Sequence, residues 1–138
     1  MRLLVCGGAG FIGSTFCRVR QRDHDDAIVV IDKLTYAGRR ENLRDVDHVL
    51  VHGGVEDPAR VAAAIDGADA VVNFAAETHV DRSIESPGEF IQTDVYGTYV
   101  LLEAARAAGV RYLQVSTDEV YGSIEEGSFT ESSPLAPS

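Results

Sequence analysis

Gly7-Gly8-Ala9-Gly10-Phe11-Ile12-Gly13 follows a short apolar run at residues 2–6, near the start of this chain of 138 residues. Glycines spaced in this way between a strand and a helix let the backbone turn tightly and let the helix pack closely on the strand. The positive end of the helix then faces the turn, which favours a phosphate group there. The stretch therefore predicts a βαβ unit whose first turn binds a phosphorylated ligand.

The alternation of short apolar runs with helical stretches continues along the chain, which is typical of a parallel sheet. We predict strands at residues 2–6, 27–31, 48–52, 68–74 and 111–116. The predicted helices include residues 11–21, a helix with Asp57 as N-cap and Pro58 in its first turn that Gly67 ends, and a long helix with a capping box from Ser86 to Glu89 that Gly109 ends. The predicted fold class is α/β, a Rossmann-like doubly wound parallel sheet of about five strands in the order 3-2-1-4-5.

Asp32 ends the second predicted strand, about twenty residues after the glycines, where an acid hydrogen-bonds the ribose hydroxyls of a dinucleotide. Together with the glycine stretch it predicts a dinucleotide site. A carboxylate here repels the 2′-phosphate of NADP, so NAD is the predicted cofactor. Lys33, Arg39 and Arg40 lie close by in the sequence and leave NADP as the alternative.

The composition excludes several classes of function. The formal net charge is −10, whereas nucleic-acid binding needs a basic face. No stretch approaches the roughly 18 to 20 apolar residues of a membrane span, and we identify no signal peptide. We therefore expect one cytoplasmic domain that binds neither nucleic acid nor membrane. Cys6 and Cys17 are expected to be small buried residues, and no metal site is predicted.

The predicted long helix has more apolar residues than one sheet-facing stripe requires. Phe90, Ile91, Val95, Tyr96 and Tyr99 belong to this excess. Either the remainder of a larger fold or a second subunit is expected to cover the outer face.

Near the C-terminal end, an apolar strand runs into a hydroxyl and two carboxylates, Val115-Ser116-Thr117-Asp118-Glu119-Val120-Tyr121-Gly122. Open α/β sheets bind ligands at the carboxyl ends of their strands. Asp118 and Glu119 could merely solvate a loop, but their place after a strand favours an acid and a base for catalysis. Neighbours in a strand point to opposite faces, so we predict that the backbone turns here to bring both carboxylates to one substrate.

Taken together, these segments resemble the dTDP-glucose 4,6-dehydratases, a family of extended short-chain dehydrogenases/reductases. The resemblance covers essentially the whole chain in the right order. Asp118-Glu119 is its most specific part, because related epimerases usually have small or hydroxyl residues there. Besides the glycine stretch and residues 116–122, it rests on Asp32-Lys33-Leu34-Thr35-Tyr36-Ala37-Gly38 and Asn73-Phe74-Ala75-Ala76-Glu77-Thr78-His79-Val80-Asp81-Arg82-Ser83.

The resemblance implies a lyase of deoxysugar biosynthesis that converts dTDP-glucose to dTDP-4-keto-6-deoxyglucose, as a homodimer. NAD takes hydride from sugar C4, water is lost across C5 and C6, and the hydride returns to C6. Glu119 would be the base at C5, Asp118 the acid at the C6 hydroxyl, and Thr117 a hydrogen-bond partner of the C4 oxygen. The implied cofactor contacts are Gly7, Gly10, Phe11, Ile12, Gly13, Asp32, Lys33, Thr35, Val55, Ala75 and Ala76, and the implied substrate contacts are Thr78, His79 and Thr117.

Other roles stay open for three residues. His79 and Arg82 are equally compatible with structural hydrogen bonding, and Tyr36 with packing on its loop. Three further positions depart from the family pattern: Cys6 stands in place of Thr, Gly54 in place of an Asp near the adenine, and Asp94 in place of Asn. The changes at Gly54 and Asp94 are expected to affect adenine binding and nicotinamide positioning.

The Tyr-x-x-x-Lys pair that starts the family's redox cycle does not occur in the 138 residues, whose only lysine is Lys33. We therefore interpret residues 1–138 as an incomplete NAD-binding Rossmann domain, the N-terminal portion of such a dehydratase, without turnover of its own. The alternatives are another sugar-nucleotide 4-epimerase or dehydratase, and a dinucleotide-binding module without catalysis.

Overall fold

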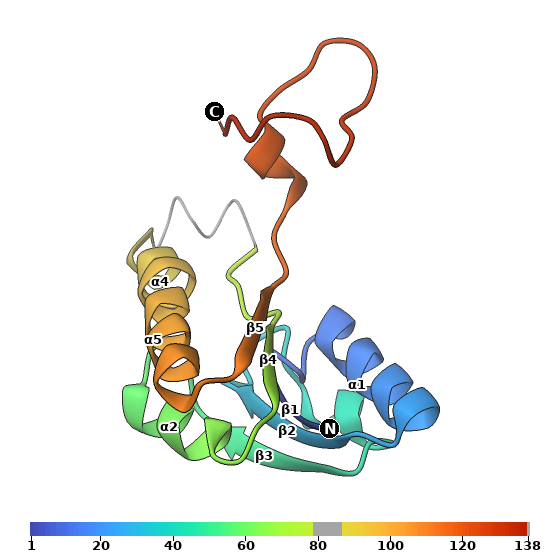
Figure 1. Ribbon diagram of the computed structural model, residues 1–138, viewed down its shortest axis with the longest axis vertical. Helices are drawn as coiled ribbons and strands as arrows, with labels where there is room; N and C mark the ends of the chain where they lie inside the picture. The colour runs from blue at the N-terminus through green and yellow to red at the C-terminus, as the bar shows by residue number, and fades with distance from the viewer. Residues whose placement is uncertain (79–86, 138) are drawn as a thin grey trace.

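The computed structural model describes residues 1–78 and 87–137, which form a parallel sheet with helices on both faces (Figure 1). The order of its strands, β3-β2-β1-β4-β5, is the predicted one. β1 pairs with β2 on one side and with β4 on the other. The strands are β1 (Arg2–Cys6), β2 (Ala27–Asp32), β3 (His48–His52), β4 (Ala70–Asn73) and β5 (Arg111–Gln114).

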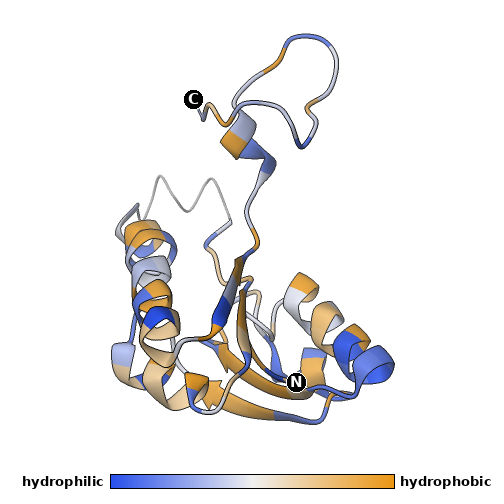
Figure 2. Ribbon diagram, viewed as in Figure 1, coloured by the Kyte–Doolittle hydropathy of each residue, from blue (hydrophilic) through white to orange (hydrophobic). Residues whose placement is uncertain are grey.

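Side chains of the central strands alternate between the two faces of the sheet, and both faces are buried. In Figure 2 these strands are coloured as apolar. Leu3 and Val5 pack with Cys17 of helix α1 (Phe11–His24) in one cluster. Leu4 and Cys6 pack in a second cluster with helix α2 (Pro58–Ile65) and the long helix. Two buried faces on one sheet give the doubly wound architecture.

Both cysteines are buried free thiols within these clusters, as the sequence predicts. Burial raises the pKa of Cys17 to about 12. It also raises the pKa of Cys6 far above its ordinary value, with a further contribution from the charge of Asp32. Thiols in this state are unreactive packing groups.

Several predicted boundaries were wrong by a few residues. α1 continues to His24 because Asp25 ends it in the left-handed conformation, with φ of 53°, and donates its amide to the carbonyl of Gln21. β4 is shorter than predicted at both ends, and β5 is shorter at its carboxyl end. Val115 still donates to the carbonyl of Asn73, but the ladder between the two strands ends there.

The long helix consists of three consecutive segments, α4 (Pro87–Phe90), a π-helical turn η2 (Ile91–Gly97) and α5 (Thr98–Ala108). Gly109 ends it with φ of 67°, as predicted. The predicted capping box includes Ser86, which lies outside the described residues. The π-helical turn was not predicted, since its apolar pattern does not differ visibly from that of an α-helix.

The outer face of this helix is exposed along its length. Its inner residues Val100, Leu101 and Ala105 are buried in the core cluster. The exposed apolar residues on the other side are Ile91, Val95, Tyr96, Tyr99 and Leu102.

Beyond β5 the chain forms an arm that extends away from the sheet (Figure 1). The arm contains a 3-10 turn, η3 (Asp118–Tyr121), and closes on itself through the amide of Ala136, which donates to the carbonyl of Val120. Tyr121 stacks on Phe129 at a centroid distance of 5.3 Å. Within residues 1–78 and 87–137, no helix has the length and apolar content of a membrane span.

The N-cap of α2 gives a direct test of the helix assignment. The Asp57 carboxylate accepts hydrogen bonds from the amides of Ala59 and Arg60. Asp57→Ala should lower the free energy of unfolding by about 1 kcal/mol, measured by urea denaturation. Asp66→Ala, at the negative end of the same helix, is the matched control and should cost nothing. Equal losses from both variants would contradict the capping role.

Candidate functional site

The glycine stretch forms a tight turn at the carboxyl end of β1. Gly7 has φ of +70°, and its carbonyl accepts the amide of Gly10 at 3.1 Å. A Cβ atom at Gly13 would collide with the carbonyl oxygen of Gly7, so only glycine lets α1 start this close to the turn. No side chain caps the N-terminus of α1. Uncapped helix amides beside a turn without side chains are suited to a phosphate.

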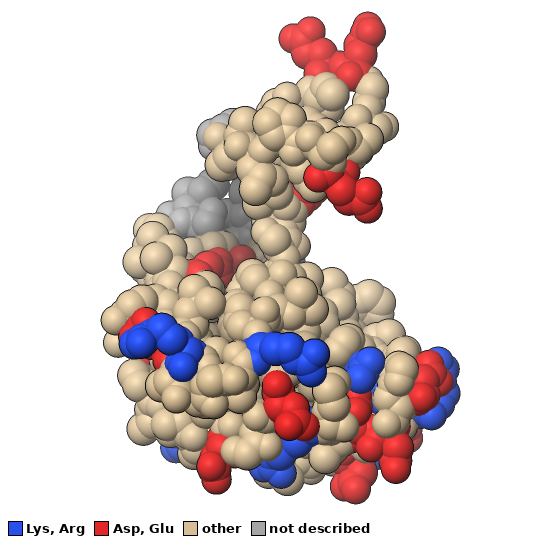
Figure 3. All heavy atoms as spheres, viewed as in Figure 1, with Lys and Arg blue, Asp and Glu red and all other residues tan. Residues whose placement is uncertain are grey.

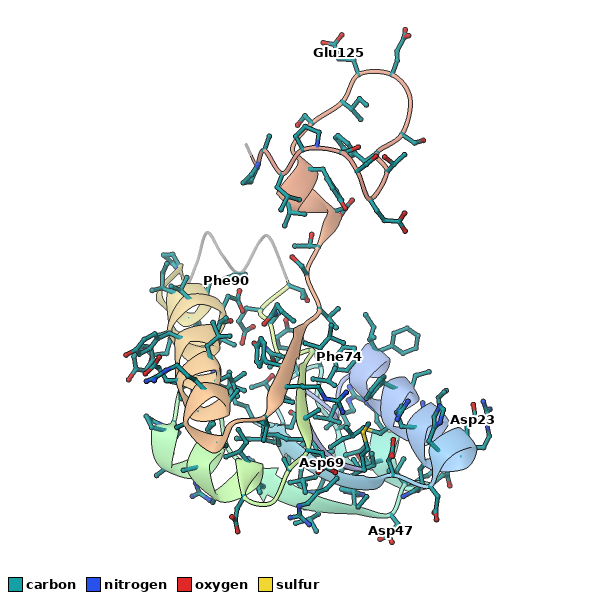
Figure 4. All side chains as sticks on the ribbon, viewed as in Figure 1. Asp23, Asp47, Asp69, Phe74, Phe90 and Glu125 are labelled. Atoms are coloured by element: carbon teal, nitrogen blue, oxygen red, sulfur yellow. The ribbon has the colours of Figure 1, made fainter. Side chains whose placement is uncertain are left out.

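Phe11 and Ile12 begin α1 at the rim of this turn, with exposed fractions of 84% and 62%. Both are implied cofactor contacts, and both line a shallow surface pocket. The other residues lining that pocket are Thr15, Phe16, Val19 and Phe74. Figure 4 labels Phe74 at the end of β4, where it packs on Phe16 at a ring distance of 5.2 Å. The edge of the phosphate site therefore adjoins an apolar surface.

Asp32 lies at the carboxyl end of β2, beside the glycine turn. Its Oδ2 accepts the amide of Ala9 at 2.9 Å, and its Oδ1 accepts the amide of Leu34 at 2.8 Å. Gly38 packs directly on the carboxylate, because a Cβ atom at Gly38 would collide with Oδ1. Each carboxylate oxygen can accept a second hydrogen bond. The structure thus fixes an acceptor one strand away from the phosphate site, where a ribose would follow.

Lys33 makes an ion pair with Glu56 at 3.0 Å and donates to the hydroxyl of Thr93 at 2.7 Å. Since its ammonium is engaged there, Lys33 is not a free cation beside Asp32. The second oxygen of Glu56, Oε2, is buried and has no hydrogen-bond partner among the described residues. A Cβ atom at Gly54 would collide with this carboxylate. Glu56 therefore occupies the space that a side chain at Gly54 would need.

The loop after β4 touches the glycine turn. A Cβ atom at Gly7 would lie 2.7 Å from the backbone nitrogen of Ala75. Buried Asn73 holds this loop by accepting the amide of Ala75 at 3.0 Å. Because β1 lies between β2 and β4, the contact lies at the switch point of the sheet, where open α/β sheets bind their ligands.

Asp94 supports the same loop from the π-helical turn. Its carboxylate accepts the amide of Glu77 at 2.9 Å. Burial raises the pKa of Asp94, while the hydrogen bond from Glu77 and the charge of Lys33 oppose the increase. Asp94 thus has a structural role, because its side chain holds the loop that carries Ala75.

The remaining predicted contacts lie around these loops. Val55 is buried against Gly97 of the π-helical turn. A Cβ atom at Gly97 would lie 2.6 Å from the Val55 side chain. Thr35, Ala76 and Thr78 are exposed loop residues. His79 and Arg82 lie outside the described residues.

Thr117, Asp118 and Glu119 are exposed at the start of the arm. The Thr117 hydroxyl accepts the amide of Glu119 at 3.2 Å and donates to Asp118 at 3.3 Å. The backbone therefore turns here, as predicted, and leaves the extended conformation at Asp118. The hydrogen bonds of these three residues are made within the turn itself, so the structure places Thr117, Asp118 and Glu119 beside one another. The glycine turn, Asp32 and Ala75 form a separate cluster at the edge of the sheet.

Three residues that shape the site were not predicted to have that role. Asn73 orients the loop after β4, Glu56 engages Lys33, and Asn42 donates to the carbonyl of Ala9 in the glycine turn. Glu56 and Asn42 act through contacts with residues distant in sequence. For Asn73, an amide at the end of an apolar strand was the available clue, since a buried amide needs partners.

Comparison with known proteins agrees with this geometry. Residues 4–138 match the model of the GDP-mannose 4,6 dehydratase family. A dTDP-glucose 4,6-dehydratase of Mycobacterium tuberculosis is 52% identical over 144 residues, which cover 100% of this chain and 44% of the relative. The chain thus spans less than half the length of this curated relative.

Two solved structures share the fold. DesIV, a dTDP-glucose 4,6-dehydratase from Streptomyces venezuelae solved with NAD and a second ligand, has a TM-score of 0.91 at 53% identity, covering 99% of this chain and 46% of DesIV. A UDP-glucose 4-epimerase from Brucella ovis in complex with NAD has a TM-score of 0.85 at 32% identity, covering 99% of this chain and 42% of the epimerase. The matched family model, extending over nearly the whole chain, shows that the protein belongs to the GDP-mannose 4,6 dehydratase family.

Proposed function

We propose that residues 1–138 are the NAD-binding part of a longer nucleotide-sugar 4,6-dehydratase that converts dTDP-glucose to dTDP-4-keto-6-deoxyglucose. The observation that carries the proposal is the acidic pair Asp118-Glu119, which follows β5 at the same edge of the sheet as the glycine turn. The similarity to dTDP-glucose 4,6-dehydratases supports it over a 4-epimerase, the second candidate. Without a Tyr-x-x-x-Lys pair, the 138 residues alone would bind ligand without turnover.

NAD fits the residues at the carboxyl edge. The amides at the start of α1 would bind its pyrophosphate, and the Asp32 carboxylate would accept the adenosine ribose hydroxyls. The buried Oε2 of Glu56, which has no hydrogen-bond partner in residues 1–78 and 87–137, offers an acceptor beyond them. When bound, NAD supplies an acceptor and donor of hydride.

The arm would supply the proton transfers of the elimination. Glu119 would remove the proton at sugar C5, which an adjacent ketone makes acidic, and Asp118 would protonate the C6 hydroxyl as it leaves as water. Thr117 would hydrogen-bond the C4 oxygen. Thr117 also caps the turn that presents the two carboxylates. The arm has five acidic residues and no basic ones from Val115 onward, and Figure 3 shows red atoms along it.

The longer protein would be a cytoplasmic homodimer. The two free, buried thiols support a reducing compartment. The exposed apolar outer face of the long helix supports a dimer, because large exposed apolar patches mark interaction surfaces. Figure 1 shows this helix at the side of the sheet opposite α1, with its outer side uncovered.

Asp32 sets the first test of the cofactor proposal. The chain should bind NAD more tightly than NADP, because the Asp32 carboxylate accepts ribose hydroxyls and repels a 2′-phosphate. Asp32→Asn should weaken NAD binding about 10-fold and reduce the preference over NADP, measured by calorimetry. The control Asp45→Asn changes an exposed acid that pairs with Arg44, and it should leave both affinities unchanged. An unaltered preference in Asp32→Asn would argue against this role.

Glu119 gives a test of the chemistry. A chimera that joins this chain to the remaining part of a related dehydratase should exchange the C5 proton of the sugar with deuterated solvent, whereas the 138 residues alone should not. In the chimera, Glu119→Gln should abolish that exchange, followed by NMR, while reduction of NAD persists. Glu125→Gln, on the same arm, should behave like the parent (Figure 4). Undiminished exchange in Glu119→Gln would remove Glu119 from the proposed role.

The dimer is tested on the same chimera. Val95→Arg places a charge in the exposed outer face of the long helix and should convert a dimer to a monomer in sedimentation velocity. Val49→Arg is the matched control, since Val49 has a similar exposed fraction, 57% against 61% for Val95, but lies on edge strand β3. A monomeric parent, or a dimer that survives Val95→Arg, would refute the proposed interface.

A further inference from the structure

The carbonyl of Ala9 is held from outside the glycine turn. It accepts the side-chain amide of Asn42 at 2.7 Å and the backbone amide of Arg39 at 3.1 Å. Both donors come from the segment after β2, which folds over the turn. A carbonyl with two donors has both lone pairs satisfied and a fixed direction.

The peptide bond between Ala9 and Gly10 is central to the turn. The amide on its other side, that of Gly10, donates to the carbonyl of Gly7 at 3.1 Å. The next carbonyl, that of Gly10, accepts the amide of Ser14 and starts the hydrogen-bond ladder of α1. Rotation of this peptide would therefore break the hydrogen bond that closes the turn, immediately before the peptide whose carbonyl starts α1.

The amide of Ala9 extends the same chain of contacts to the ribose site, because it donates to Asp32 at 2.9 Å. Ala9 is fully buried. Leu43, the residue that follows Asn42, is also fully buried and packs in the core cluster on the α1 side of the sheet. The side-chain amide of Asn42 therefore belongs to a segment that is anchored in the core.

Asn42 is itself fixed from a second direction. Its backbone carbonyl accepts Arg18 of α1 at 2.7 Å. Arg18 lies on the same helix whose first amides face the phosphate site. Asn42 therefore connects the glycine turn to the body of α1 and holds the two in a fixed relative position.

We propose that Asn42 is a positioning residue for the pyrophosphate of the bound dinucleotide. It directs the Ala9 carbonyl toward the segment after β2, and away from the anion that the helix amides bind. A carbonyl oxygen turned toward a phosphate would repel it, so a site built from backbone amides needs its carbonyls held elsewhere. The inference rests on the proposed function, because it assumes a pyrophosphate at the start of α1.

The test compares two ligands that differ only in the pyrophosphate, ADP and adenosine. In the 138-residue chain, Asn42→Leu keeps the side-chain volume but removes the donor. It should weaken ADP binding about 3- to 10-fold and change adenosine binding by less than about 2-fold, from titrations followed by amide NMR. Asn42→Ala should give the same selective loss, and it serves as the second variant if the leucine cannot be accommodated.

Gln21→Leu is the matched control. The carboxamide of Gln21 also joins α1 to a loop, through two 2.9 Å hydrogen bonds with the backbone of Asp47, but at the opposite end of the sheet. It should lower the thermal midpoint and leave the ratio of ADP to adenosine affinity at the parent value. If both Asn42 variants kept the parent ratio, the positioning role would be wrong. If the parent chain bound ADP no better than adenosine, the proposed dinucleotide function would itself fail.

Discussion

The structure depends on a close approach of backbone to backbone at the carboxyl end of β1. Three segments meet there, and neither Gly7 nor Gly13 has room for a side chain: Gly13 packs on Gly7, and Gly7 packs on the backbone of Ala75. This steric constraint brings the start of α1, the glycine turn after β1 and the loop after β4 to one edge. A substitution that forced them apart would displace the start of α1, the glycine turn and the loop after β4 together, because only glycine leaves room for this backbone contact.

The same constraint explains how an acidic protein can bind an anion. The formal net charge is −10, and the one lysine is committed to Glu56. The face shown in Figure 3 has blue and red atoms interspersed over the body, without a continuous basic patch. In the proposed function, attraction for phosphate would come from oriented backbone amides, which act over a few ångströms and need accurate placement. Residues that orient those peptides then matter as much as residues that touch the ligand.

Most of the sheet could be predicted from sequence, because strand periodicity, glycine spacing and the N-cap at Asp57 are local signals. The turn at Asp118 also followed from a local argument about strand geometry. The contacts of Asn42, Glu56 and Asp94 could not, since each joins segments that meet only after the sheet has formed. The departure at Gly54 illustrates the limit. From the sequence, Gly54 indicates only a missing side chain, whereas in the fold the carboxylate of Glu56 occupies the space that a side chain at Gly54 would need.

The π-helical turn links the two ligand loops to one support. Thr93 contacts Lys33, next to Asp32, while its neighbour Asp94 holds the loop after β4 through Glu77. Gly97 lets this turn approach Val55 closely. A wider helical turn is a common way to re-aim side chains at a functional site. Because consecutive residues of one turn hold loops that follow different strands, the spacing between those loops is set by this helix as well as by the sheet. The long helix thus supports the candidate site through its inner face, while the apolar residues of its outer face are exposed.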